Sequence, residues 1–138
     1  MNNRQIDASL KDIKSYKGCI FKDAINRKTR NGSYVVNMDN SDGAGTHWCG
    51  LVLTTNIGYW YDSFGVHPPE ETKVLKRTNR KVYFNSDQLQ SVIAKTCGAW
   101  CVDFIKHMND TKNDYQGYID RYRHGETEYN EKKLKSNS

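Results

Sequence analysis

Four side chains of this sequence could together carry out acyl transfer through a thiol. They are a cysteine as nucleophile, a histidine as base, an acid to orient the histidine and a glutamine to bind an oxyanion: Cys97, His47, Asp62 and Gln90. A thiol deprotonated by a neighbouring imidazole attacks carbonyl carbon, and a carboxylate beside the imidazole fixes its tautomer and stabilises its cation. These residue types predict nucleophilic catalysis, provided that the fold brings the four together.

Cys97 stands directly before a run of apolar residues at helical spacing. The run includes Trp100, Phe104 and Met108, which lie four residues apart and predict a buried helical stripe. Backbone N–H groups at a helix N-terminus stabilise a thiolate and lower the pKa of the thiol. A buried structural cysteine is the alternative, and the thiol considered alone favours that interpretation.

His47 and Asp62 are placed by a predicted β-hairpin. His47 opens a strand over residues 47–55, a tight turn covers 56–58, and Asp62 ends the following strand. A short turn places the far ends of its two strands side by side, within reach of a cross-strand contact. An ordinary polar pair at the surface is the alternative for these two residues.

Gln90 precedes Cys97 by seven residues in a predicted loop. Its side-chain amide could donate to the oxyanion that forms when the thiolate attacks, together with the backbone N–H of Cys97. A solvated loop glutamine is the alternative, and Gln88 offers the same chemistry.

The elements that must position these residues are helices and strands in mixed order. Beside the hairpin and the helix from Cys97 we expect helices over 8–16 and 115–122, strands over 33–39 and 81–84, helical turns over 70–75 and a loop over 40–45. This order predicts an α+β fold, with a central antiparallel sheet whose hairpin packs on the helix that begins at Cys97. The charged tail over 126–138 predicts a frayed end.

Length and composition limit the kind of protein. The chain has 138 residues, 36% hydrophobic and 27% charged, and a net charge of +5, which predicts one domain over 1–138 and a monomer. It contains no apolar run of membrane-spanning length, so we expect an intracellular protein with no membrane partner and with free thiols at its four cysteines. The basic charge is compatible with a nucleic-acid partner, and equally with a role in solubility alone.

Three segments of the sequence resemble a known family when they are taken in order. GTHW (45–48), YWYDSFG (59–65) and TCGAWCVDF (96–104), with a glutamine seven residues before the cysteine, resemble adenain and the adenovirus-type cysteine proteases of large DNA viruses, virophages and transposons. That family is related to the proteases that process ubiquitin-like proteins. The resemblance covers residues 34–107, about half of the chain, and Asp62 stands where adenain has glutamate.

The resemblance implies a papain-like, adenain-like fold and a role for each residue of the site. It implies His47 as general base, Asp62 as orienting acid, Cys97 as nucleophile and Gln90 as oxyanion donor. It also implies substrate contacts at two further residues, Trp48 and Gly98. A large ring beside the histidine would narrow the substrate channel to residues without side chains, although Trp48 could equally be a core residue of the hairpin.

The resemblance also implies a biological role. The expected substrate is a polypeptide with glycine next to the scissile bond, and the expected role is maturation of viral precursor proteins in the host cell or the virion. Processing of ubiquitin-like modifiers is the alternative. The family requires no cofactor, and adenain is stimulated by DNA and by a viral peptide.

Two interpretations from other classes compete with a protease. His47 and Cys49 share one side of a strand, Cys97 and Cys101 share one face of a helix, and the four could close a structural zinc site. That site would leave Asp62 and Gln90 without a role. The other alternative is a noncatalytic DNA-binding virion protein that retains a protease-like fold.

Overall fold

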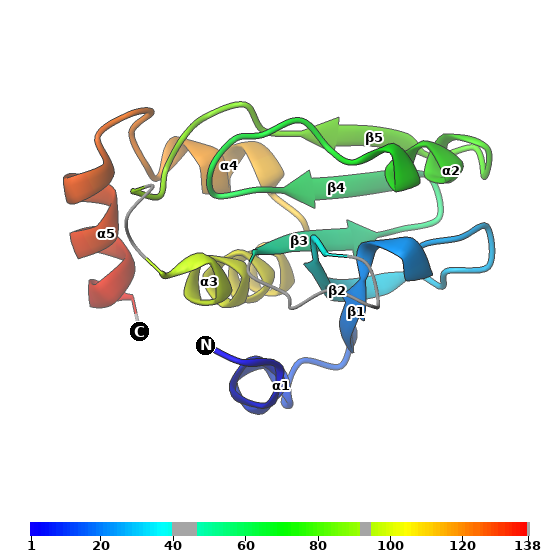
Figure 1. Cartoon of the computed structure of the whole chain (residues 1–138), viewed down its shortest axis with the longest axis horizontal. Helices are drawn as coiled ribbons and strands as arrows, with labels where there is room; N and C mark the ends of the chain where they lie inside the picture. Colours follow the sequence, from blue (N-terminus) through cyan, green and yellow to red (C-terminus); the bar gives the residue numbers. More distant parts are fainter. Residues whose placement is uncertain (40–46, 92–94, 138) are drawn as a thin grey trace.

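The computed structural model describes residues 1–39, 47–91 and 95–137, which form an α+β fold around one mixed sheet (Figure 1). The sheet has five strands in sequence order: β1 (Tyr16–Phe21), β2 (Gly32–Asn37), β3 (Trp48–Leu53), β4 (Ile57–Tyr61) and β5 (Lys81–Phe84). The two central pairings, β2 with β3 and β3 with β4, are antiparallel, whereas β1–β2 and β4–β5 are parallel. The expectation of an antiparallel sheet is therefore right for the centre and wrong for both edges.

Five α-helices and two short 3-10 turns accompany the sheet in the described ranges. They are α1 (Asn3–Leu10), η1 (Lys22–Ala24), η2 (Glu70–Thr72), α2 (Lys73–Lys76), α3 (Cys97–Asp110), α4 (Tyr115–Asp120) and α5 (Thr127–Ser136). Helix α3 packs on β3, and both α1 and α5 contact α3 (Figure 1). Met1 and Asn137 consequently line one pocket together with residues of α3.

Alternating side chains of the strands divide the core between the two faces of the sheet. On one face Val35, Val52 and Tyr61 pack with the helical residues Trp100 and Phe104. The opposite face holds a smaller cluster of buried residues: Ile25, Tyr34, Val36, Cys49, Leu51, Leu53, Trp60 and Leu75. Because residues i and i+2 of a strand share a face, this alternation fixes the register of the hairpin.

The N-terminal region differs from the sequence-based expectation. A capping box between Asn2 and Gln5 starts α1 at Asn3, and Ile6 and Leu10, four residues apart, supply its buried face. The expected helix over 8–16 is therefore placed too late, and the segment that follows forms strand β1. The loop expected over 40–45 lies outside the described residues.

The C-terminal region is helical where we expected a frayed tail. Helix α5 buries Asn130 and Leu134, and the Glu131 carboxylate accepts hydrogen bonds from the side chains of Thr96 and Trp100. Polar contacts, rather than a broad apolar face, hold this helix against the domain.

Among the helices of the described ranges, none is long and apolar enough to cross a membrane.

Candidate active site

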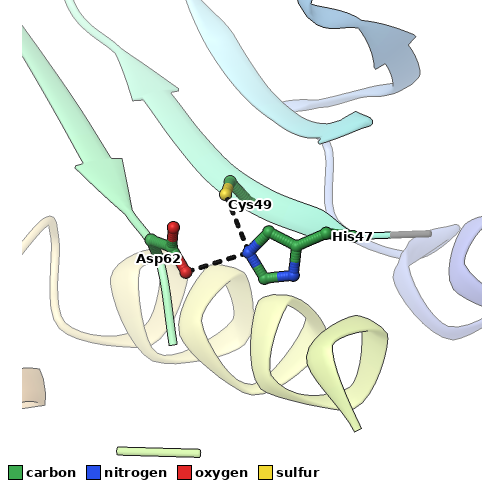
Figure 2. A group of neighbouring side chains, drawn as sticks. All are labelled: His47, Cys49 and Asp62. Atoms are coloured by element: carbon green, nitrogen blue, oxygen red, sulfur yellow. Dashed lines mark hydrogen bonds and ion pairs between the residues drawn. The ribbon is translucent and has the colours of Figure 1, made fainter. Parts of the chain in front are cut away.

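The His47 ring lies between two strand ends, as the hairpin predicts. His47 immediately precedes β3 and Asp62 immediately follows β4. The His47 Nε2 and Asp62 Oδ1 atoms are 2.9 Å apart, and the Asp62 side chain is almost completely buried (Figure 2). The other ring nitrogen, Nδ1, points away from Asp62. It is buried, and within the described residues no hydrogen bond to it meets the usual distance and angle limits.

A tight turn after β4 orients the Asp62 carboxylate toward His47. Its Oδ1 atom also accepts a 2.8 Å hydrogen bond from the Phe64 N–H, and the Gly65 N–H donates to the Asp62 carbonyl at 2.9 Å. Gly65 adopts a φ of +72°, and a Cβ there would lie 2.7 Å from the backbone oxygens of Ser86 and Asp87, so glycine alone suits this position. The Phe64 ring then packs on the His47 ring with centroids 4.7 Å apart.

Asn85 holds the backbone of Asp62 from the next strand. Its Oδ1 atom accepts from the Asp62 N–H at 2.9 Å, and its Nδ2 atom donates to the Asp62 carbonyl at 2.6 Å. Asn85 directly follows β5 and is buried. The pairing of β4 with β5 ends at Phe84. The Asn85 side chain continues it by hydrogen bonding the Asp62 backbone, and this holds Asp62 in place relative to the sheet.

Cys97 is the first residue of α3, and its side chain is only slightly exposed. Burial raises the pKa of the thiol, but interactions with the His47 imidazole and with the backbone amides of Trp48 and Gly98 outweigh burial and lower the pKa below its ordinary value. Because Nε2 is bonded to Asp62, Nδ1 is the ring nitrogen that can act on the thiol. The site therefore favours a thiolate at Cys97.

The imidazole shows the complementary shift. Burial lowers the pKa of His47, but the hydrogen bond to Asp62 and the interaction with Cys97 raise it to a net value of about 9. A base with a raised pKa beside a thiol with a lowered pKa is the signature of an imidazolium–thiolate pair. Such a pair is ready to attack a carbonyl carbon near neutral pH.

Gln90 is buried and tied to the residue that follows the acid. The Ser63 hydroxyl donates to Gln90 Oε1, and the Ser63 carbonyl accepts from the N–H groups of Leu89 and Gln90 at 2.9 Å each. Ser63 thereby fixes which end of the Gln90 amide is its acceptor end. The donor end, Nε2, is the atom that an oxyanion would require.

Trp48 and Gly98, the two expected substrate contacts, lie in different surroundings. Trp48 is half-buried and lines a cavity of about 370 Å³ together with Asn37, Cys19 and residues 1–3. Gly98 faces α1, since a Cβ at Gly98 would lie 3.4 Å from the Cδ1 atom of Ile6. The missing side chain of Gly98 thus serves the packing of α1 on α3, and its backbone N–H serves Cys97.

Two residues near the site were not anticipated from the sequence: Asn85 and Ser63, which position Asp62 and Gln90. Cys49, which the sequence places on the same side of the strand as His47, has its sulfur 3.6 Å from His47 Nε2 (Figure 2). Of Asn85 and Ser63, the serine lies within a conspicuous motif. Asn85 could have been suspected because it directly follows a strand, but an asparagine there is usually assigned to a turn.

Replacing Asp62 by asparagine should shift the pH dependence of thiol reactivity. The new side-chain amide would still accept from the Phe64 N–H, but the substitution removes the charge that raises the pKa of His47, so the imidazolium is lost at lower pH. The pKa of Cys97 rises in turn. We expect alkylation of Cys97 by iodoacetamide at pH 7 to slow about 10-fold, since one pKa unit changes the thiolate fraction by that factor.

The measurement is the alkylation rate from pH 5 to 10, with Asp120→Asn as a control at an exposed carboxylate of α4. Wild-type Cys97 should already be alkylated in the acidic part of this range, because it reacts as part of an ion pair. The alkylation rate should change again near the His47 pKa of about 9, where the imidazolium loses its proton. Superimposable profiles for Asp62→Asn and wild type would show that the carboxylate does not tune this pair.

Comparisons with known proteins add little to the site itself. No protein-family model and no curated protein matches the sequence. Among solved structures, the crystal structure of the pS273R protease of ASFV is similar with a TM-score of 0.46 and 20% identity. The match covers 71% of this chain, and this chain spans 42% of the length of that protease.

The fold brings three candidate catalytic side chains together. The chain is an α+β domain in which a cysteine at a helix start, a histidine at a strand end and a buried aspartate converge.

Proposed function

We propose that this chain is a cysteine endopeptidase in which Cys97 attacks the peptide carbonyl and His47 transfers the protons. The observation that carries the proposal is the 2.9 Å contact of His47 Nε2 with the buried Asp62 carboxylate, which leaves the other ring nitrogen for Cys97 at the start of α3. The lowered pKa of Cys97 and the raised pKa of His47 agree with this arrangement. A structural cysteine beside a histidine has no need of a buried acid that stabilises the imidazolium.

The reaction follows from the positions of these groups. The Cys97 thiolate forms a bond to the carbonyl carbon, and the carbonyl oxygen takes the electron pair as an oxyanion. Gln90 and the backbone N–H of Cys97 are the proposed donors to this oxyanion. Collapse of the intermediate breaks the C–N bond, and His47 gives its Nδ1 proton to the leaving amine. His47 then removes a proton from water, which hydrolyses the thioester and regenerates the thiol.

The proposed substrate is a polypeptide with glycine next to the scissile bond. The support is the place of Trp48, which directly follows the proposed base His47 and is half-buried. The adenain resemblance of the sequence suggests maturation of viral precursor proteins as the role, with processing of ubiquitin-like modifiers as the alternative. The net charge of +5 makes stimulation by DNA worth testing in the same assays.

A pair of matched peptides tests the glycine preference. We expect a fluorogenic peptide that ends in Gly-Gly before the scissile bond to be cleaved at least about 10-fold faster than its Ala-Ala counterpart, since each of the two added methyl groups can change the rate by this order in a closely fitted channel. In the Trp48→Ala variant the channel should be wider, so the cleavage rates of the two peptides should differ less. Equal cleavage of both peptides by wild type would contradict the proposed specificity and leave the nucleophile to be judged separately.

A metal site is the second candidate function, and one cluster favours it. Ligand atoms of His47, Cys49 and Asp62 lie within 4.8 Å of one another. This set differs from the zinc set expected from the sequence, because Asp62 takes the place of Cys97 and Cys101. One equivalent of tightly bound zinc in the purified protein, lost on Cys49→Ser, would favour this function over proteolysis.

A further inference from the structure

The loop that carries Gln90 is held from two sides. On one side Ser63 accepts from the backbone of Leu89 and Gln90 and donates to the Gln90 side chain. On the other side the loop meets residues 123–130, which form the turn before helix α5 and the first part of that helix. The oxyanion donor proposed above therefore depends on residues that follow Cys97 by about one quarter of the chain.

Asn130 is the centre of the second side. Its side chain is completely buried, and its Nδ2 atom donates to the Leu89 carbonyl at 3.3 Å and to the Arg123 carbonyl at 2.6 Å. Its Oδ1 atom accepts from the Arg123 N–H at 2.8 Å. One amide thus joins helix α5, the turn before it and the residue next to Gln90.

Two further contacts attach the same segment to Gln88. The Gly125 N–H donates to the Gln88 carbonyl at 2.9 Å, and His124 Nδ1 accepts from the Gln88 N–H at 3.0 Å. The backbones of residues 88 and 89 are therefore bonded to the C-terminal segment, whereas the N–H groups of residues 89 and 90 are bonded to Ser63.

Helix α5 also contacts the start of α3. The Glu131 carboxylate accepts from the Thr96 hydroxyl at 2.9 Å and from the Trp100 indole N–H at 3.3 Å. Thr96 directly precedes Cys97. Two neighbouring residues of α5 therefore contact the two segments that would bind the oxyanion. Asn130 contacts the loop that carries Gln90, and Glu131 contacts the residue before Cys97.

From these contacts we infer that Asn130 is a positioning residue for oxyanion binding: it fixes the loop so that the Gln90 amide is held in register with Cys97. The inference rests on the proposed function. Catalytic groups must be held to within about 0.5 Å of their productive geometry, and a displacement of about 1 Å caused far from the chemistry can lower a rate about 100-fold. Removing the Asn130 amide leaves the buried Leu89 carbonyl without this donor, so that only the contacts of Gly125 and His124 with Gln88 still hold this side of the loop.

The test compares two reactions of Cys97 in the Asn130→Ala variant. Peptide cleavage passes through an oxyanion, whereas alkylation by iodoacetamide requires the thiolate but forms no oxyanion. We expect the kcat of cleavage to fall about 10- to 100-fold with little change in KM. The alkylation rate should stay within about 2-fold of wild type, because the His47–Cys97 pair is untouched. Asn137→Ala, which removes a contact of the same helix to Tyr122, is the matched control and should cleave normally.

A double-mutant cycle with Gln90→Ala makes the assignment specific. If Asn130 acts through Gln90, adding Asn130→Ala to Gln90→Ala should cost less than about 3-fold in kcat. Additive losses, an equal fall in alkylation and cleavage, or wild-type cleavage by a folded Asn130→Ala would each overturn the inference. Absence of cleavage by wild type would instead overturn the proposed function, and the inference with it. If Asn130→Ala does not fold, Asn130→Asp retains the acceptor for the Arg123 N–H, removes the donor to the carbonyls of Leu89 and Arg123, and is judged by the same criteria.

Discussion

Replacing Cys97 by alanine should lower kcat/KM for peptide cleavage by about 10⁴-fold or more, the scale of loss seen when a covalent nucleophile is removed. The Cys97 sulfur is the atom that forms the acyl-enzyme in the proposed reaction, and the lowered pKa of this thiol makes it reactive near neutral pH. The measurement is initial-rate cleavage of the Gly-Gly peptide, after thermal unfolding has shown that the variant folds.

Cys19→Ala is the matched control for the Cys97 variant. Cys19 is also a free, incompletely buried thiol, but burial raises its pKa to about 11 and its neighbours are Tyr16 and Asp7. We expect this variant to cleave within about 2-fold of wild type, since an unactivated thiol contributes no nucleophile. A Cys97→Ala protein that cleaves normally would exclude Cys97 as the nucleophile.

Replacing His47 by alanine should abolish both the base and the partner of the thiolate. Burial raises the pKa of Cys97, and without the imidazole the backbone amides of Trp48 and Gly98 are left to oppose it. We therefore expect cleavage to fall about 10³- to 10⁴-fold or more. Alkylation of Cys97 at pH 7 should fall about 10-fold or more, since the thiolate fraction falls tenfold for each unit of pKa.

His67→Ala serves as the control, because His67 lies on an exposed segment and contacts Pro68 and Phe84. It should retain both activities. If His47→Ala slowed cleavage and left alkylation unchanged, His47 would act on protons in the reaction without activating the thiol, contrary to the ion pair described above.

The hairpin and helix α3 could be predicted because local pattern and tertiary packing agree there. Alternating residues of β3 and β4 bury two faces, and the short turn leaves one register. The apolar spacing from Trp100 to Met108 similarly fixes the face of α3 that packs on the sheet. These two elements place Cys97, His47 and Asp62, whereas the prediction that they are catalytic comes from the resemblance to adenain.

Elements whose stability comes from tertiary contacts could not be predicted. Strand β1 contains Lys17 and Gly18, and its pairing with β2 is irregular between Tyr16 and Gly18. Helix α5 buries Asn130 through hydrogen bonds to distant backbone atoms, so its sequence has a weak apolar pattern. Parallel pairing of the edge strands also leaves no local signal, because the partners are joined by long connections.

The supporting residues of the site were missed for the same reason. Asn85 acts through hydrogen bonds to a residue 23 positions away, and Ser63 binds Gln90 across 27 positions. Neither spacing is a known motif. The candidate catalytic residues could be proposed from the sequence, whereas the residues that hold them in place could be identified only in the structure.

The most direct test of the central claim is intact-mass spectrometry after reaction with a peptide vinyl sulfone ending in Gly-Gly. Wild type and Cys97→Ala are compared, each with and without DNA. The proposed function predicts a single adduct on wild type that maps to Cys97 and is absent from the variant. An adduct that persists in Cys97→Ala, or no adduct on wild type under either condition, would contradict Cys97 as the nucleophile of a protease.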